Sequence, residues 1–150
     1  MAGSECAGSR ITLAINLQLR PGRNGASARV ELRSRPGGTV ALVSVRGRVE
    51  RIAFRRLAQT LADLGTRGVQ TLLLDCAELS DIEPRVVSSL VEALEQFASR
   101  PGRYAVCGLS PLLRERFRVA GRGTGLRCWP SASELLASPF ALESPVEWAS

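Results

Sequence analysis

Two hydrophobic patterns follow one another in the middle of the chain, and they predict a buried strand and an amphipathic helix. The apolar run 72–74, closed by Asp75, is typical of a strand that is buried on both faces, as parallel strands are. After a polar connection, apolar residues recur at the spacing of one helix face, at Val87, Leu90, Val91, Leu94 and Ala98. Pro84 suits the first helical position, where its missing N–H has no intrahelical partner anyway. Residues 69–97 therefore predict a strand, an exposed loop and a helix.

Upstream, alternating apolar and polar residues predict a hairpin that leads into another helix. Residues 28–34 alternate, residues 40–45 are more apolar, and the Pro-Gly-Gly sequence at 36–38 signals a turn between them. We expect Gly47 to break the second strand. The helix that follows should end at Gly65 and bury a stripe formed by Phe54, Leu57, Ala58, Leu61 and Leu64.

Downstream, two more strands and two more helices are expected. Residues 104–107 predict a short strand, and Ser110 and Pro111 begin a helix that buries Leu113, Phe117 and Ala120. Residues 126–129 predict a last strand, and residues 131–134 have the spacing of a capping box that opens a final helix. Right-handed crossovers place the first two long helices on one face. The fold class is therefore α/β, a mixed sheet with a parallel centre, an antiparallel edge hairpin and helices packed mainly on one face.

The composition predicts one globular domain with an extension at each end. A chain of 150 residues, of which 45% are apolar, is long enough and apolar enough for one hydrophobic core. Residues 1–27 are rich in Gly, Ser, Ala and Arg and are expected to be poorly ordered, although the alternation at 11–19 predicts an additional edge strand there. We therefore divide the chain into an N-terminal extension (1–27), a domain (28–138) and a C-terminal tail (139–150).

Several classes of site and location are disfavoured by the composition. The chain has no apolar run near the roughly 20 residues of a membrane helix and no signal-peptide order, so we expect a cytoplasmic protein without membrane insertion. It has no histidine and no CxxC pair, which removes the usual general base and the zinc spacing. We expect no enzyme, no metal and no cofactor. Asp75, Asp81 and Glu83 are interpreted as solvated loop and cap residues, and residues 121–125 as a loop that lacks the lysine of a phosphate-binding motif.

The net charge of +6 rests on arginine alone, because the 20 basic residues include no lysine. The arginines are scattered and no nucleic-acid motif accompanies them, so we expect no direct binding to nucleic acid. Near the start of the first long helix they form either a solvated face or a docking surface for an acidic partner. This group comprises Arg46, Arg48, Arg51, Arg55 and Arg56.

Two of the four cysteines end strands that are predicted to be parallel neighbours. Adjacent strands lie about 4.8 Å apart, which brings Cys76 and Cys107 within the Cα separation of a disulfide. The two thiols are therefore a candidate redox pair. The alternative, expected in a reducing compartment, is two buried free thiols.

Several segments between residues 28 and 138 also occur in an order and spacing that is typical of one family. VALVSVRGRVERIAFRRLAQTL resembles a second strand, a Gly-x-[Leu/Val]-[Asp/Glu] turn and a first helix, with Gly47, Val49 and Glu50 in the turn. LLLDCAEL resembles a central strand that ends in a Leu-Asp pair, and YAVCGLSPLLRERFRVAG resembles the last main strand with its helix. Together they resemble the STAS domain, which is the fold of the anti-sigma factor antagonists.

The departure from this family lies in the loop before the second long helix. In regulated members that loop carries Asp-Ser-Ser/Thr-Gly, and a partner kinase phosphorylates a serine there. The four positions are occupied here by Glu83, Pro84, Arg85 and Val86. Both hydroxyls and the glycine are absent, so a phosphate switch at that point is unavailable to this chain. Nearby serines either replace the lost hydroxyl or are ordinary surface and helix serines, namely Ser80, Ser88 and Ser89.

The resemblance implies a protein that acts by binding. It would be an anti-sigma factor antagonist that binds an anti-sigma factor, often a histidine-kinase-like ATPase, and so regulates sigma-factor-dependent transcription. The expected partner-binding residues are Gly47, Arg48, Val49, Ser80, Asp81, Ile82, Glu83, Pro84, Arg85, Val86 and Ser88. The alternative is a structural STAS subunit of a transporter or signalling complex. A homodimer is compatible with both.

Overall fold

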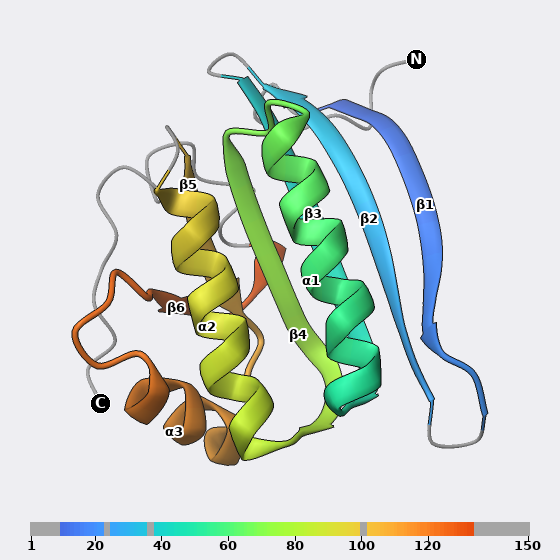
Figure 1. Ribbon diagram of the computed structural model, residues 1–150. Coiled ribbons are helices and arrows are strands. Elements are labelled where there is room, and N and C mark those ends of the chain that lie inside the picture. Colours follow the sequence, from blue (N-terminus) through green and yellow to red (C-terminus); the bar gives the residue numbers. More distant parts are fainter. Residues whose placement is uncertain (1–9, 23–24, 36–37, 100–101, 134–150) are drawn as a thin grey trace.

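Figure 1 shows the computed structural model, which describes residues 10–22, 25–35, 38–99 and 102–133. These residues form one six-stranded sheet and three helices. The strands are β1 (Arg10–Arg20), β2 (Ala26–Arg35), β3 (Gly38–Val49), β4 (Thr71–Ile82), β5 (Arg103–Cys107) and β6 (Cys128–Trp129). The helices are α1 (Arg51–Thr66), α2 (Pro84–Ala98) and α3 (Pro111–Ala120). The predicted mixed α/β sheet is confirmed.

The strands lie side by side in the order in which the chain forms them, from β1 to β6. The two steps from β1 to β3 are antiparallel, and the three steps from β3 to β6 are parallel. Successive right-handed crossovers that move in one direction across a sheet place their helices on the same face. Accordingly, α1, α2 and α3 cover one face, with α2 in contact with both of the others (Figure 1).

The hydrophobic core lies mainly between this helical layer and the sheet. Leu61 of α1, Leu94 of α2 and Phe117 of α3 pack with β3 and β4 in one buried cluster. A second, smaller cluster on the opposite face contains Leu42 and Leu73, with Trp129 packed against it. The centre of the sheet is therefore buried on both faces, as the apolar run in the sequence predicts.

The starts of α1 and α3 follow the capping rules, whereas one predicted helix end is wrong. Glu50 caps α1 by accepting the Ala53 N–H at 2.9 Å, and Ser110 caps α3 by accepting the Leu113 N–H at 3.4 Å. The first long helix does not end at Gly65, because it continues to Thr66 and the Arg67 N–H donates to Asp63 O. The predicted final helix, which the capping box at 131–134 opens, lies largely beyond residue 133 and so outside the described residues.

Strand β4 is longer than the sequence predicts. It continues from Asp75 to Ile82, where we expected an exposed loop. Between the register pairs Ser44↔Asp75 and Arg46↔Glu78, β3 advances two residues and β4 advances three. A further extra residue of β4 lies between Gly47↔Leu79 and Arg48↔Asp81. Because of these two bulges, the buried residues of this part of β4 are three positions apart and not two, namely Cys76, Leu79 and Ile82. The alternation that is typical of a strand is therefore absent from the sequence.

Strand β3 likewise continues through Gly47 to Val49, so Gly47 does not break it. Gly47 has a φ of +90°, which L-residues rarely adopt, and a Cβ there would collide with Gly25 O. The glycine is therefore needed for the close passage of the chain at 25–26, and it does not act as a strand terminator.

The sheet also extends further toward the N-terminus than the division at residue 28 implies. Residues 10–20 form β1, which pairs with β2 along most of its length. The predicted edge strand is thus confirmed, and the expectation of poor order is wrong for this segment. Residues 1–9 and 134–150 lie outside the described residues, so the rest of the proposed division stays a prediction.

Candidate functional site

The carboxyl ends of β3 and β4 and the start of α2 meet at one end of the sheet, at the lower edge of Figure 1. Arg48 is opposite Asp81 in the sheet, and the Glu83 N–H donates to Val49 O at 3.2 Å. We name the accessible residues gathered there the candidate surface. Its members are Gly47, Arg48, Ser80, Asp81, Glu83, Pro84, Arg85 and Ser88.

Three residues that the sequence assigned to partner binding lie beneath this surface. Val49, Ile82 and Val86 are 1%, 0% and 5% exposed and belong to the main core cluster. Their side chains therefore support the two strand ends and the first turn of α2 from below. A partner docked on the outside would touch the eight residues of the candidate surface and would leave these three covered.

An arginine from α3 fixes the end of β4. Arg116 Nη1 donates to Asp81 Oδ1 at 2.9 Å and to Ile82 O at 2.8 Å. Asp81 Oδ2 also lies 3.8 Å from Arg48 Nε of β3. Asp81, near the end of β4, thus contacts both Arg48 of β3 and Arg116 of α3. Arg116 was not predicted as a site residue, because it lies on a different helix, far along the chain from Asp81, although the segment that resembles the last main strand and its helix contains it.

Two other carboxylates near this end of the sheet, those of Glu50 and Glu78, are also engaged. Glu50 accepts the Ala53 N–H and pairs with Arg20 at 2.6 Å, and Glu78 pairs with Arg46 at 2.8 Å. The Ala53 N–H, together with the charge of Arg20, holds the pKa of Glu50 below its ordinary value.

Some arginines at this end of the molecule form no ion pair with a carboxylate of the described residues. Arg51, Arg55 and Arg85 are exposed and have no ion pair with another described residue. The first turns of α1 and α2 contain no acidic residue, and the carboxylate at the start of each helix is that of the N-cap residue, Glu50 or Glu83. The surroundings of the candidate surface therefore favour a negatively charged partner.

Two acidic residues of β4 have structural roles. Asp75 Oδ1 accepts the Ala77 N–H at 3.0 Å and so closes the first bulge, while Asp81 is held by Arg116. Glu83 occupies the cap position of α2 without a capping bond from its side chain. Among the residues that the structure describes, no group of three potential ligands gathers into a metal site.

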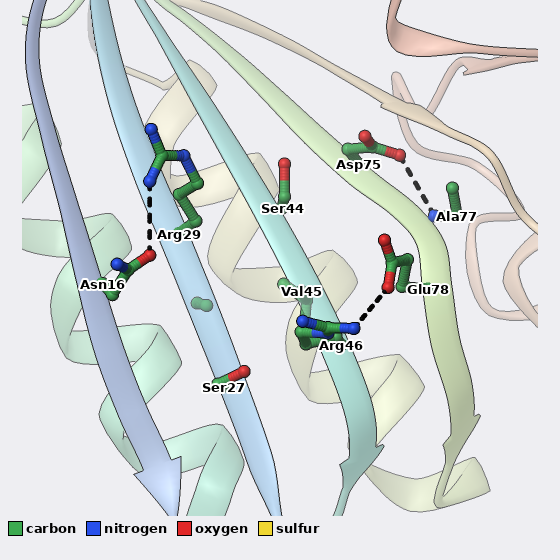
Figure 2. A pocket seen from close by; sticks show the side chains of 10 residues that line it. Asn16, Ser27, Arg29, Ser44, Val45, Arg46, Asp75, Ala77 and Glu78 are labelled. Atoms are coloured by element: carbon green, nitrogen blue, oxygen red, sulfur yellow. Dashed lines mark hydrogen bonds and ion pairs between the residues drawn. The ribbon is translucent and has the colours of Figure 1, made fainter.

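A polar hollow of about 480 Å³ lies on the sheet face away from the helices, and Figure 2 shows it from close by. Arg29 and Arg46 reach into it, but Arg29 pairs with Glu31 at 3.0 Å and Arg46 with Glu78 at 2.8 Å. Asp75 and Ser44 also line it. Because its arginines are matched by carboxylates, the hollow offers no net charge with which to select an ionic ligand.

The cysteines do not form the redox pair considered from the sequence. Cys76 and Cys107 are both free and buried. Cys76 belongs to the cluster under the helices and Cys107 to the cluster on the opposite face, because Cys107 is opposite Asp75 and not Cys76. Burial raises the pKa of Cys107 to about 12, and it also raises that of Cys76. The geometry therefore favours two buried, unreactive thiols, which is the alternative that the sequence left open.

The glycine-rich segment 121–125 is a loop held by a carboxylate. Glu95 Oε2 accepts the Gly125 N–H at 3.1 Å and the Tyr104 hydroxyl at 2.6 Å. Burial and this hydrogen bond raise the pKa of Tyr104. A protein carboxylate already occupies the Gly125 donor, so the segment anchors α3 to α2 and offers no phosphate cradle there.

Comparison with known proteins places this architecture among solved structures. No protein-family model matches the chain, and no curated protein matches it by sequence. An anti-sigma factor antagonist from Mycobacterium paratuberculosis is similar in structure, with a TM-score of 0.62, 17% identity, and coverage of 82% of this chain and 98% of that one. The phosphorylated Bacillus cell fate determinant SpoIIAA has a TM-score of 0.53 and 17% identity over 65% of this chain and 87% of its own.

The same architecture occurs inside a larger protein. The murine solute carrier 26 family member A9 anion transporter matches 88% of this chain but only 23% of the transporter, with a TM-score of 0.59 and 14% identity. At such identities the likeness shows the fold alone. The chain therefore has the SpoIIAA-like, or STAS, fold that the sequence segments resemble. None of the described helices is both long and apolar enough to cross a membrane.

Proposed function

We propose that this protein is an anti-sigma factor antagonist that acts by binding and not by catalysis. It would bind an anti-sigma factor in the cytoplasm and so free a sigma factor for transcription. The observation that carries the proposal is the candidate surface itself, built from the ends of β3 and β4 and the start of α2 on a fold shared with the antagonist from Mycobacterium paratuberculosis. The resemblance of the sequence segments supports the same function.

The chemistry of the surface defines what kind of partner and control it suits. Arg85 and its unpaired neighbours favour an acidic patch on the anti-sigma factor, so association should slow as salt rises. Pro84 and Arg85 stand where regulated relatives carry hydroxyls, so phosphorylation at those two positions would not release the partner. Binding would therefore be constitutive or controlled elsewhere. A histidine-kinase-like ATPase is the partner that the resemblance suggests.

The proposal is tested by affinity capture of the tagged protein from its own host, in parallel with two charge reversals. Arg85→Glu changes the centre of the candidate surface, and a glutamate in the first turn of α2 suits the helix dipole, so folding should be preserved. Arg103→Glu makes the same change at an exposed residue at the start of β5, at the opposite end of the sheet. Mass spectrometry identifies the bound proteins.

We expect the wild-type chain and Arg103→Glu to retain an anti-sigma factor and Arg85→Glu to lose at least ten-fold of it, about 1.4 kcal/mol of binding free energy. Equal capture by all three variants would remove the candidate surface from the proposal. Capture of no anti-sigma factor by the wild-type chain would overturn the proposed function.

A second function has one observation in its favour. The same fold covers 88% of this chain within an anion transporter. A structural STAS subunit of a transporter or signalling complex would stabilise a larger assembly and would not sequester a regulator. Capture from detergent-solubilised membranes discriminates the two, because a membrane subunit bound in place of an anti-sigma factor would favour the structural function.

A further inference from the structure

We propose that β1 pairs with the same strand of a second copy of this chain and forms a two-fold symmetric dimer. In the described part of the chain β1 is the first strand of the sheet, and β2 is its one neighbour. Its outer edge therefore presents backbone N–H and C=O groups to solvent. Strand β2 separates this edge from β3, and no residue of β1 belongs to the candidate surface, so the inference is independent of the proposed function.

The edge lacks the charged residues and the proline that often prevent such pairing. Between Arg10 and Arg20 the strand contains no charged residue and no proline. Leu13 and Ile15 are 47% and 41% exposed, although both occupy the apolar positions of the strand. An uncharged edge with exposed apolar side chains is suited to strand addition.

The C-terminal part of β1 is not accessible to a second strand, which limits where such a strand can pair. Leu19 is buried in the core, and Arg56 of α1 donates to Gln18 O at 3.3 Å. The register with β2 shifts between Ile11 and Leu13 and again between Gln18 and Arg20. The regular and open part of the strand is therefore the segment from Leu13 to Leu17.

The sequence of this open segment is symmetric in pattern, and this identifies a second copy as the occupant. In antiparallel pairing centred on Ile15, Ile15 faces its own copy and Leu13 faces Leu17 of the other chain. Ala14 then faces Asn16 on the opposite side of the sheet. Apolar residues meet apolar residues on the helical side in both halves, as cross-strand stabilisation requires. A two-fold pairing uses the β1 edge of both copies, so assembly stops at the dimer.

The size and charge of the contact predict its strength. A few paired residues cover much less than the roughly 800 Å² per partner of a standard interface, so the dimer should form only at high concentration. Each copy carries a net charge of +6, while the paired segment carries none. Added salt screens the mutual repulsion and should strengthen the dimer, which is the reverse of its effect on an acidic partner.

Sedimentation velocity over about 10 µM to about 500 µM tests the inference, because weak interfaces dissociate in this range. We expect the wild-type chain to shift from monomer to dimer and Ile15→Lys to remain monomeric at every concentration. Ile52→Lys is the matched control, since Ile52 of α1 is 51% exposed and lies outside the β1 edge, and it should dimerise like the wild type. Circular dichroism checks that both variants fold.

Three outcomes would overturn the inference: a wild-type chain that stays monomeric at about 500 µM, an Ile15→Lys variant that dimerises as the wild type does, or oligomers that grow beyond two copies. Because Ile15 is remote from the candidate surface, Ile15→Lys should leave capture of the anti-sigma factor unchanged. Failure of the dimer and failure of the proposed function are therefore separate results.

Discussion

The two halves of β4 differ in the strands that flank them and in the regularity of their pairing. From Thr71 to Asp75 the strand pairs without interruption with β3 on one side and β5 on the other. From Cys76 to Ile82 it pairs with β3 alone and contains two bulges. The regular half is core on both faces, whereas the bulged half alternates buried residues with exposed ones such as Glu78 and Ser80.

This difference allows one strand to serve both stability and the binding that we propose. The regular half is covered on both faces and flanked by a strand on each side, so its side chains are not accessible to a partner. The bulges give the other half extra residues that bend it and re-aim its side chains toward solvent. Asp75 and Asp81 mark the change, because the first closes a bulge and the second joins the strand end to α3. Stability and binding should therefore respond to different halves of β4.

The largest effect should come from the regular half. Leu74 is fully buried, and Leu74→Ala should lower the free energy of unfolding by about 3–5 kcal/mol, because it leaves a cavity in a close-packed region. Leu79 is 7% exposed in the bulged half, where the structure relaxes more easily, so Leu79→Ala should cost about 2 kcal/mol. Urea denaturation of both variants measures the difference. Equal losses would show that the two halves are packed equally well.

A medium effect is expected where α3 holds the end of β4. Arg116→Ala removes the hydrogen bonds to Asp81 and to Ile82 O and should cost about 1–3 kcal/mol. Arg118→Ala is the matched control on the same helix, because its exposed pair with Glu115 should contribute about 0.2–1 kcal/mol. The free energies of unfolding compare the two directly. If Arg118→Ala costs as much as Arg116→Ala, the anchoring role of Arg116 is contradicted.

The smallest effect concerns the stability of the fold at acidic pH. The folded state holds the pKa of Glu50 below its ordinary value of 4.5, so the charged form stabilises the fold. This contribution is fully present above that ordinary value and is lost as the pH falls through the lower pKa of the folded state. Denaturation midpoints measured from neutral pH downward should show a smaller acid-induced loss in Glu50→Gln than in the wild type. An identical loss in both would remove Glu50 as a source of acid sensitivity.

The sequence predicted the regular parts of this fold well, because their periodicity is undisturbed. The stripe on α2 and the run at 72–74 follow the simple spacings of a helix and a buried strand, and both were found. The continuation of β4 was missed because two bulges give Cys76, Leu79 and Ile82 a spacing of three. That spacing matches neither the period of a strand nor that of a helix.

The position of the candidate surface was predicted in part. Gly47 and Arg85 were assigned to partner binding through the resemblance, and both lie in the candidate surface, while their role in binding stays a prediction. Arg116 was missed because its contacts depend on how α3 packs, which no local pattern encodes. The pairing of Cys76 with Cys107 failed because a strand register decides the face of each side chain, and a single sequence does not reveal the register.

Amide hydrogen exchange of the protein, alone and with the anti-sigma factor that we propose as its partner, tests whether the candidate surface is the binding site. We expect the partner to slow exchange in the segment from Glu78 to Ser88, while the core half of β4, from Thr71 to Asp75, is slow in both states. Protection at the β1 edge or in the loop 121–125, with none between Glu78 and Ser88, would contradict the proposal and move the binding site elsewhere on the fold.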